Sequence, residues 1–144
     1  MNIRVLAATV AGAITMFVLG YLIFGLALAE YMRANTVQYP GLMVEPPRFI
    51  PLFLANLVWA WLIAYIFEHW ARIRTFASGL IGGSVIMLPI ALAVDLQYLA
   101  FMNIWTSTLP MFIDVIAVTV MGAIVGGVIG LVLGMMDKQP AAAE

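Results

Sequence analysis

The chain has 144 residues, of which 65% are hydrophobic and 9% are charged, with a formal net charge of -1. A soluble domain carries about 25% charged residues to cover its core, so this composition predicts an integral membrane protein. The charge balance excludes a broad basic field for nucleic acid. Without cysteine and with one histidine, thiolate chemistry and conventional zinc, haem or iron–sulfur sites are not expected, and we expect no cofactor.

Four long stretches of the chain carry almost no charge, and each is long enough to cross a bilayer, which takes about 20 helical residues. We therefore predict an all-α fold, a four-helix transmembrane bundle forming one domain. The helices are expected at about 5–29, 49–69, 75–102 and 110–136. Residues 30–48 are expected to form an outer loop, and residues 138–144 a disordered tail.

The first stretch, between Arg4 and Glu30, ends in Ala27-Leu28-Ala29, which has the small-x-small form of a signal-peptidase site. A signal-peptide core is about 7–15 residues long, and this apolar run is far longer. We therefore expect an uncleaved first helix.

Basic residues in the short flanks predict the orientation. Four spans bring both termini and the second link to one side, which carries Arg4, Arg72, Arg74 and Lys138. The other side carries Arg33 and Arg48. Because lysine and arginine concentrate on the cytoplasmic side, both termini are predicted to be cytoplasmic.

Charged residues also gather where the second helix ends. Glu68 and Arg72 are four residues apart, which predicts an ion pair on one helix face. His69 lies between them and is expected to be an interfacial residue rather than a ligand or a proton relay.

Two aspartates fall near the predicted outer ends of the third and fourth helices. Asp95 and Asp114 should lie close to one depth, with Asn56 slightly deeper and Arg48 on the same side. An ionisable group in a membrane is a candidate for function because its burial is costly unless it is paired. A structural role, as an anchor or a clamp to the first loop, and a ligand or ion site are both open.

The second span carries aromatic residues near its middle rather than at the interfaces that tryptophan prefers. Trp59, Trp61 and Tyr65 could line a site for a lipophilic ligand. Trp59 and Trp61 point to different faces, so at least one of them should pack inside the bundle. Plain packing is the simpler interpretation of all three.

The fourth span has a glycine at every fourth position: Gly122, Gly126, Gly130 and Gly134. Small residues at this spacing let two helices approach closely in lipid. Packing inside the bundle is favoured over a dimer seam, with Gly79 and Gly83, or Gly12 and Gly20, as candidate partners.

One resemblance accompanies these patterns. The segment Leu19-Gly20-Tyr21-Leu22-Ile23-Phe24-Gly25, a loop ending in Glu45-Pro46-Pro47, three further spans and the glycine-rich last helix resemble a group of small bacterial membrane proteins of unknown function. The resemblance implies four helices in a bacterial inner membrane. It implies no activity and no site residues.

Three function classes remain open. The first, which the small size, the absence of catalytic motifs and the glycine seams favour most, is a non-catalytic accessory or self-associating subunit. Its partners would be the lipid bilayer and further copies of the chain or a larger complex. The second is a small transporter or channel using the aspartate pair, and the third is a membrane-embedded enzyme or a binder of a lipophilic ligand that uses the aromatic second helix. No phosphate-binding, dinucleotide, metalloprotease or serine-hydrolase motif is present, so the sequence favours a protein that is not an enzyme.

Overall fold

The computed structural model describes residues 2–137 and confirms the all-α prediction. Within that range the chain forms five α-helices and two π-helical segments, and no β-strand. Four helical stretches are long and apolar enough to cross a membrane: Ile3–Ala27, Phe49–Ala71, Phe76–Phe101 and Thr108–Asp137. Lys138 and the predicted tail 138–144 lie outside the described residues.

Each of the first two spans changes from α-helix to π-helix before it ends. The first consists of α1 (Ile3–Gly20) and the π-helical segment η1 (Tyr21–Ala27). The second consists of α3 (Phe49–Ile66) and the π-helical segment η2 (Phe67–Ala71). The other two spans are single helices, α4 (Phe76–Phe101) and α5 (Thr108–Asp137).

The outer loop is shorter than the sequence predicted, because helix α2 (Ala29–Asn35) occupies its first part. The prediction ended the helix at the first charged residue, Glu30. That residue lies instead in the first turn of α2, and Arg33 lies in the last turn. Both positions favour the helix dipole, so charge ends the apolar span without ending helical structure.

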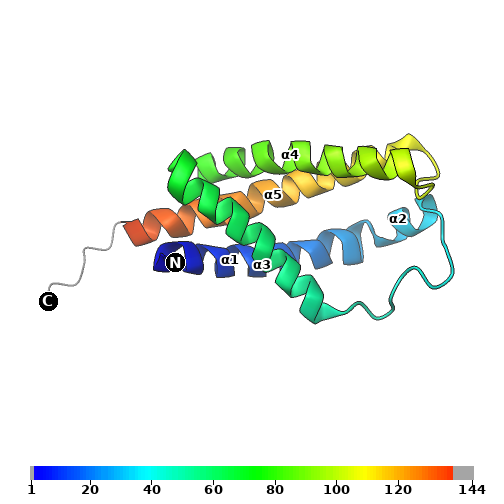
Figure 1. The fold of residues 1–144 in the computed structure, drawn as a ribbon, viewed down its shortest axis with the longest axis horizontal. Coiled ribbons are helices and arrows are strands. Elements are labelled where there is room, and N and C mark those ends of the chain that lie inside the picture. The colour runs from blue at the N-terminus through cyan, green and yellow to red at the C-terminus, as the bar shows by residue number, and fades with distance from the viewer. Residues whose placement is uncertain (1, 138–144) are drawn as a thin grey trace, which may run out of the picture.

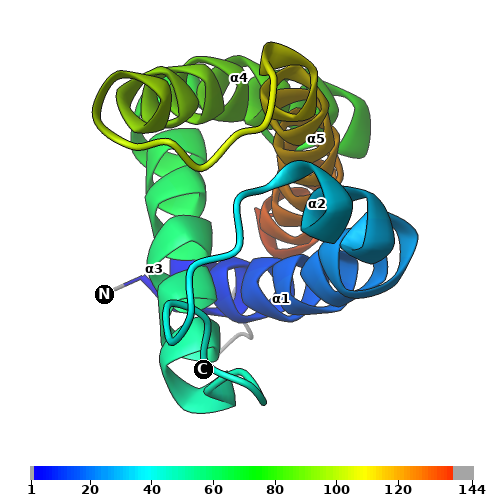
Figure 2. The same ribbon diagram turned by 90° about the vertical axis from the view of Figure 1, so that its right-hand side faces the viewer.

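The four spans pack unequally (Figures 1 and 2). α4 lies alongside α5 for most of its length, and α1 packs against both α3 and α5. α3 crosses the bundle obliquely and makes its main contacts with α1 rather than with α4. The first residues of α1 and the last residues of α5 lie at one end of the bundle, here named the terminal end. The opposite end, with residues 36–48 and 102–107, is the loop end.

The glycines of α5 face α4 inside the bundle. A Cβ atom added to Gly126 would lie 2.7 Å from the Cα of Gly83, and one added to Gly130 would lie 2.6 Å from the carbonyl oxygen of Thr75. Such distances leave room for hydrogen only. Gly79 and Gly83 are therefore true partners of the ladder, whereas Gly20 has no atom within 4 Å of its added Cβ.

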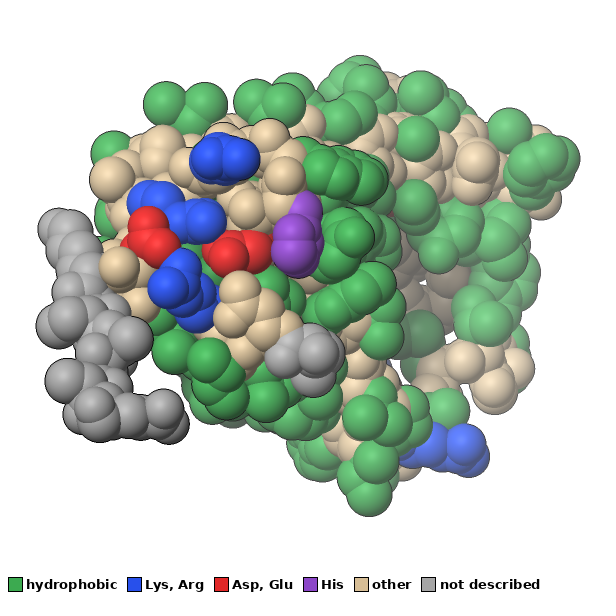
Figure 3. Space-filling model, turned by 60° about the vertical axis from the view of Figure 1, so that its left-hand side comes forward, with side chains coloured by type: hydrophobic (Ala, Val, Ile, Leu, Met, Phe, Trp, Pro, Cys, Tyr) green, Lys and Arg blue, Asp and Glu red, His purple; other side chains and the backbone are tan. Residues whose placement is uncertain are grey.

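Ion pairs join the helices at the terminal end (Figure 3). Arg74 lies 2.8 Å from a carboxylate oxygen of Glu68 and 3.7 Å from one of Asp137, which also pairs with Arg4. The predicted Glu68–Arg72 pair is therefore wrong. Arg72 ends the second span in the left-handed conformation, with φ of 50°. The chain turns at this residue, and Arg74, two residues later, is the arginine that pairs with Glu68.

Hydrogen bonds join the two connections at the loop end. The Val37 amide donates to the Ile104 carbonyl at 2.8 Å. The Tyr39 hydroxyl donates to the Asn103 carbonyl at 2.9 Å. The first loop is thus fastened across the short α4–α5 connection, where it covers part of the bundle (Figure 2).

Candidate functional site

Asp95 and Asp114 come from neighbouring antiparallel helices and meet near the loop end. Asp95 lies six residues before the end of α4, and Asp114 six residues after the start of α5. At about 1.5 Å per helical residue, each lies about 9 Å inside the helix end. Their carboxyl groups are within hydrogen-bonding reach of each other.

The environment of Asp95 leaves part of its carboxyl group without a partner. The residue is 4% exposed, and its Oδ2 atom accepts no hydrogen bond from residues 2–137. An ionised carboxylate has acceptors only. Two such groups facing each other therefore need a hydrogen-bond donor between them, which a shared proton, a water molecule or a cation can supply.

A cavity of about 280 Å³ opens beside this pair. All four spans contribute to its wall, which is mostly apolar. The lining residues are Met16, Asn56, Trp59, Met87, Ile90, Ala91, Val94, Asp95, Tyr98, Asp114, Val118 and Met121. The lining contains no lysine, arginine or histidine, so no basic side chain of the wall balances the charge of the pair.

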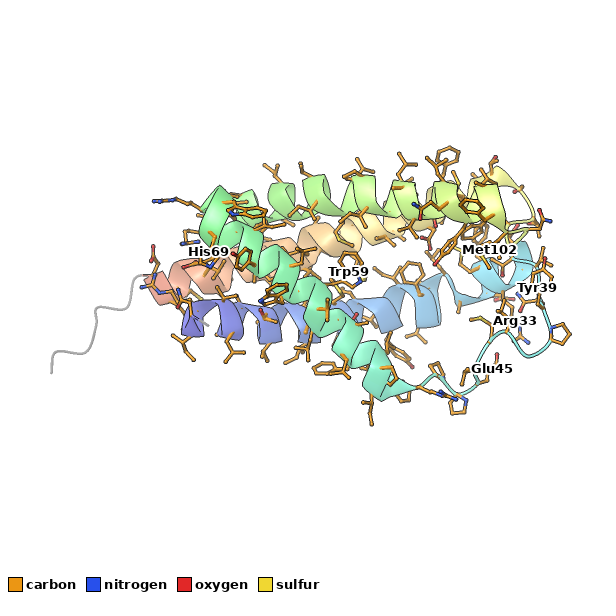
Figure 4. All side chains as sticks on the ribbon, viewed as in Figure 1. Arg33, Tyr39, Glu45, Trp59, His69 and Met102 are labelled. Atoms are coloured by element: carbon orange, nitrogen blue, oxygen red, sulfur yellow. The ribbon has the colours of Figure 1, made fainter. Side chains whose placement is uncertain are left out.

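A second cavity of about 660 Å³ lies at the loop end, and we name it the vestibule. Arg33, Tyr39 and Glu45 contribute to its wall, and Figure 4 shows them gathered beside the first loop. Tyr98 and Asp114 line both cavities. The vestibule therefore leads from the loop end to the aspartate pair.

The depth of the pair suits access from the vestibule. α4 has 26 residues and is about 39 Å long, compared with about 30 Å for the hydrocarbon core of a bilayer. If the excess is shared equally, the pair lies about 4 Å inside the hydrocarbon boundary. It is buried by protein and yet close to the water of the loop end.

The structure separates the predicted site residues into two groups. Asn56 and Trp59 line the cavity beside the aspartates, as a site at this position requires. Arg48 does not: it precedes α3 as its N-cap and lines neither cavity. The oblique course of α3 carries its first residue away from α4, which the sequence alone did not indicate.

The predicted aromatic group divides in the same way. Trp61 is 43% exposed and Tyr65 is 37% exposed, and neither lines a described cavity. Their ring centroids are 5.6 Å apart, and the Tyr65 ring lies 4.5 Å from that of His69. This stack runs along the outer face of the second span, so only Trp59 belongs to the cavity.

Several lining residues were not predicted from the sequence. Tyr98 follows Asp95 by three positions, and this spacing puts both residues on one helix face. The sequence therefore contained a signal that Tyr98 lies near Asp95. The three methionines, Met16, Met87 and Met121, come from three different helices. Each is one apolar residue among many, and no sequence signal distinguishes them.

The chemistry offered by the site is recognition of positive charge in an apolar setting. The polar groups of the lining are two carboxyl groups, the amide of Asn56, the phenol of Tyr98 and the indole N–H of Trp59. Within residues 2–137, no group of three His, Cys, Asp or Glu side chains is arranged to hold a metal ion. Neither cysteine nor serine stands beside the pair as a nucleophile.

Comparison with known proteins adds no relative: no family model, no curated protein and no solved structure matches the chain.

Proposed function

We propose that this protein binds a small organic cation within the membrane, with Asp95 and Asp114 as the counter-charge. The observation that supports this most directly is the unpartnered, buried Oδ2 atom of Asp95 at the wall of the cavity. A positively charged ligand supplies this oxygen with a donor, in place of a proton shared by the two carboxyl groups. It also removes the repulsion between two carboxylates in a place that water reaches poorly.

The composition of the wall favours an organic cation over a bare metal ion. Calcium takes six to eight oxygen ligands, and magnesium keeps a shell of ordered oxygens. The side-chain oxygens of the wall come from Asp95, Asp114, Asn56 and Tyr98 among methionine, valine and isoleucine side chains, and in residues 2–137 no three His, Cys, Asp or Glu side chains are grouped to hold a metal ion. An ammonium group donates hydrogen bonds to the carboxylates, while its carbon substituents contact the apolar wall. Trp59 and Tyr98 add aromatic faces that attract cations.

This proposal takes the place of the non-catalytic accessory or self-associating subunit expected from the sequence. All four ladder glycines are buried in the bundle and face α4 or the link before it. They are already used for packing within one chain. Because these glycines already pack against helices of the same chain, they give no reason to expect a second copy of the chain at that face.

We also propose that the terminal end faces the cytoplasm of a bacterial inner membrane. Arg4, Arg72 and Arg74 lie at that end, which agrees with the positive-inside rule. The vestibule then opens to the outside. Reporter enzymes fused to the C-terminus, one active only in the cytoplasm and one only outside it, test this orientation.

The proposed binding is tested with Asp95→Asn and Asp114→Asn, compared with Glu30→Gln as the control. Glu30 lies on α2 and lines neither cavity, so its loss changes the net charge without changing the site. Butylammonium binding is measured by isothermal titration calorimetry on protein in detergent. We expect each aspartate variant to bind at least about tenfold more weakly, since a charged hydrogen bond of about 1.5–3 kcal/mol is lost, and the control to bind normally.

Melting measurements on the same variants separate binding from folding. Asparagine at position 95 places an N–H donor next to Asp114, so it replaces a repulsive contact by a hydrogen bond. Asp95→Asn should therefore melt at or above the temperature of the unchanged protein. Weaker binding together with a lower melting temperature would point to a structural role for the pair and would refute the proposal.

A further inference from the structure

The cavity beside the aspartates has a mouth on the side of the bundle as well as the connection to the vestibule. Trp59, Val94 and Tyr98 line the cavity and are also 36%, 38% and 43% exposed at the surface. A side chain that lines the cavity and is also exposed at the surface lies at an opening of the cavity. Trp59 comes from α3, and the other two come from α4, so the mouth lies between these two helices.

The packing of the bundle accounts for this mouth. α4 packs along α5, while α3 packs against α1 and diverges from α4 along its course (Figure 1). Consecutive helices of a bundle usually lie together along their length. Here their separation leaves the cavity wall incomplete on one side.

Between Trp59 and Val94 the mouth faces the hydrocarbon core, while Tyr98, three residues before the end of α4, lies near the hydrocarbon boundary beside the vestibule. Trp59 lies ten residues after the start of the second span, Phe49–Ala71, and is therefore about 15 Å along it. This is the middle of a hydrocarbon layer about 30 Å thick. Figure 4 likewise shows Trp59 midway along the bundle, far from the labelled residues at the loop end.

The site is thus polar at one end and open to acyl chains at the other. At the polar end Asp95, 4% exposed, has a carboxylate oxygen without a hydrogen-bond partner in the described chain. At the other end the lining consists of apolar and aromatic side chains. A ligand that satisfies both ends carries a positive head and an apolar chain.

We infer that the ligand is an amphiphilic amine, whose ammonium head binds between Asp95 and Asp114 and whose hydrocarbon chain leaves the cavity between Trp59 and Val94. This inference rests on the proposed cation site and adds the class of ligand to it. Such an amine reaches its site from within the bilayer through the mouth. A short amine has no chain to place there, and it reaches the aspartates through the vestibule.

The test compares two primary amines and two matched variants. Val94→Trp fills the mouth without changing the aspartates. Val85→Trp is the control, because Val85 lies on the same helix, is 66% exposed and lines neither cavity. Binding of radiolabelled butylammonium and dodecylammonium is measured on protein in lipid nanodiscs. Nanodiscs carrying the Asp95→Asn/Asp114→Asn variant give the background from lipid.

The expected result is selective loss of the long-chain amine. The chain must crowd past the new indole at position 94, and overpacking of this kind corresponds to at least about fivefold weaker binding of dodecylammonium. Val94→Trp should weaken butylammonium binding clearly less than dodecylammonium binding, because the short chain ends before the mouth. Val85→Trp should bind both amines normally.

Other results overturn the inference in distinguishable ways. Dodecylammonium binding that Val94→Trp leaves unchanged would exclude the chain from the mouth and leave the cation site intact. Equal weakening of both amines by Val94→Trp, repeated in the milder variant Val94→Phe, would also refute the inference. If neither amine binds the unchanged protein above the lipid background, the proposed cation site fails, and the inference fails with it.

Discussion

Replacing Gly126 by alanine tests whether the close approach of α4 and α5 determines the stability of the bundle. The new methyl carbon would lie 2.7 Å from the Cα and 3.0 Å from the nitrogen of Gly83. Carbon atoms in ordinary contact are about 3.5–4.0 Å apart. Both neighbours are backbone atoms, so no side chain can rotate away, and the two helices must separate by about 1 Å.

The cost follows from the contacts on either side of the substitution. A gap of 0.5–1 Å removes about a quarter to a half of the dispersion energy of each contact that it opens. Inserting a methyl group into a well-packed core costs about 1–3 kcal/mol, and the absence of side-chain relief places this case at the upper end. At about 2–4 °C per kcal/mol, we expect the apparent melting temperature to fall by about 5–10 °C.

Circular dichroism on protein in detergent measures the change, with Gly20→Ala as the matched control. Gly20 is also helical, and its added Cβ has no atom within 4 Å. Alanine is the better helix former by about 0.8–1 kcal/mol, so this variant should melt at the original temperature or slightly above it. If Gly126→Ala melts as high as Gly20→Ala, the glycine contact is not what holds α4 against α5.

Two further predictions concern the link between the second and third spans. Arg74→Ala should lower the free energy of unfolding by about 1–3 kcal/mol, because Glu68, whose side chain is 10% exposed, loses a cation at 2.8 Å. Thermal melts compare it with Arg72→Ala, which removes an exposed arginine from the same link; equal melting of the two variants would contradict the prediction. Thr75→Ala should cost about 1 kcal/mol, because the threonine hydroxyl accepts a hydrogen bond from the Ser78 amide at 3.2 Å and caps α4. In Thr75→Ala, amide hydrogen exchange in the first turn of α4 should also be faster. Unchanged exchange there would show that the threonine does not cap the helix.

The sequence alone was sufficient for the number and the approximate positions of the spans. The spacing of charged residues had to match the thickness of a bilayer, and the uncharged stretches Arg4–Glu30, Arg48–Glu68 and Arg74–Asp95 have suitable lengths. The glycine ladder identified the packing face of α5 in the same direct way. Only a glycine has no side chain, so its repeat every fourth residue indicates where a backbone comes close.

The tertiary structure decided which residues share a site. Asp95 and Asp114 meet because α4 and α5 pack along their length, whereas Arg48 is carried away by the oblique course of α3. Trp59 reaches the cavity and Trp61, two residues later, faces outward. In a soluble helix the polar face reveals which side is buried. In these spans nearly every face is apolar, because lipid and protein interior accept the same side chains, so the sequence carries little information on which face turns inward.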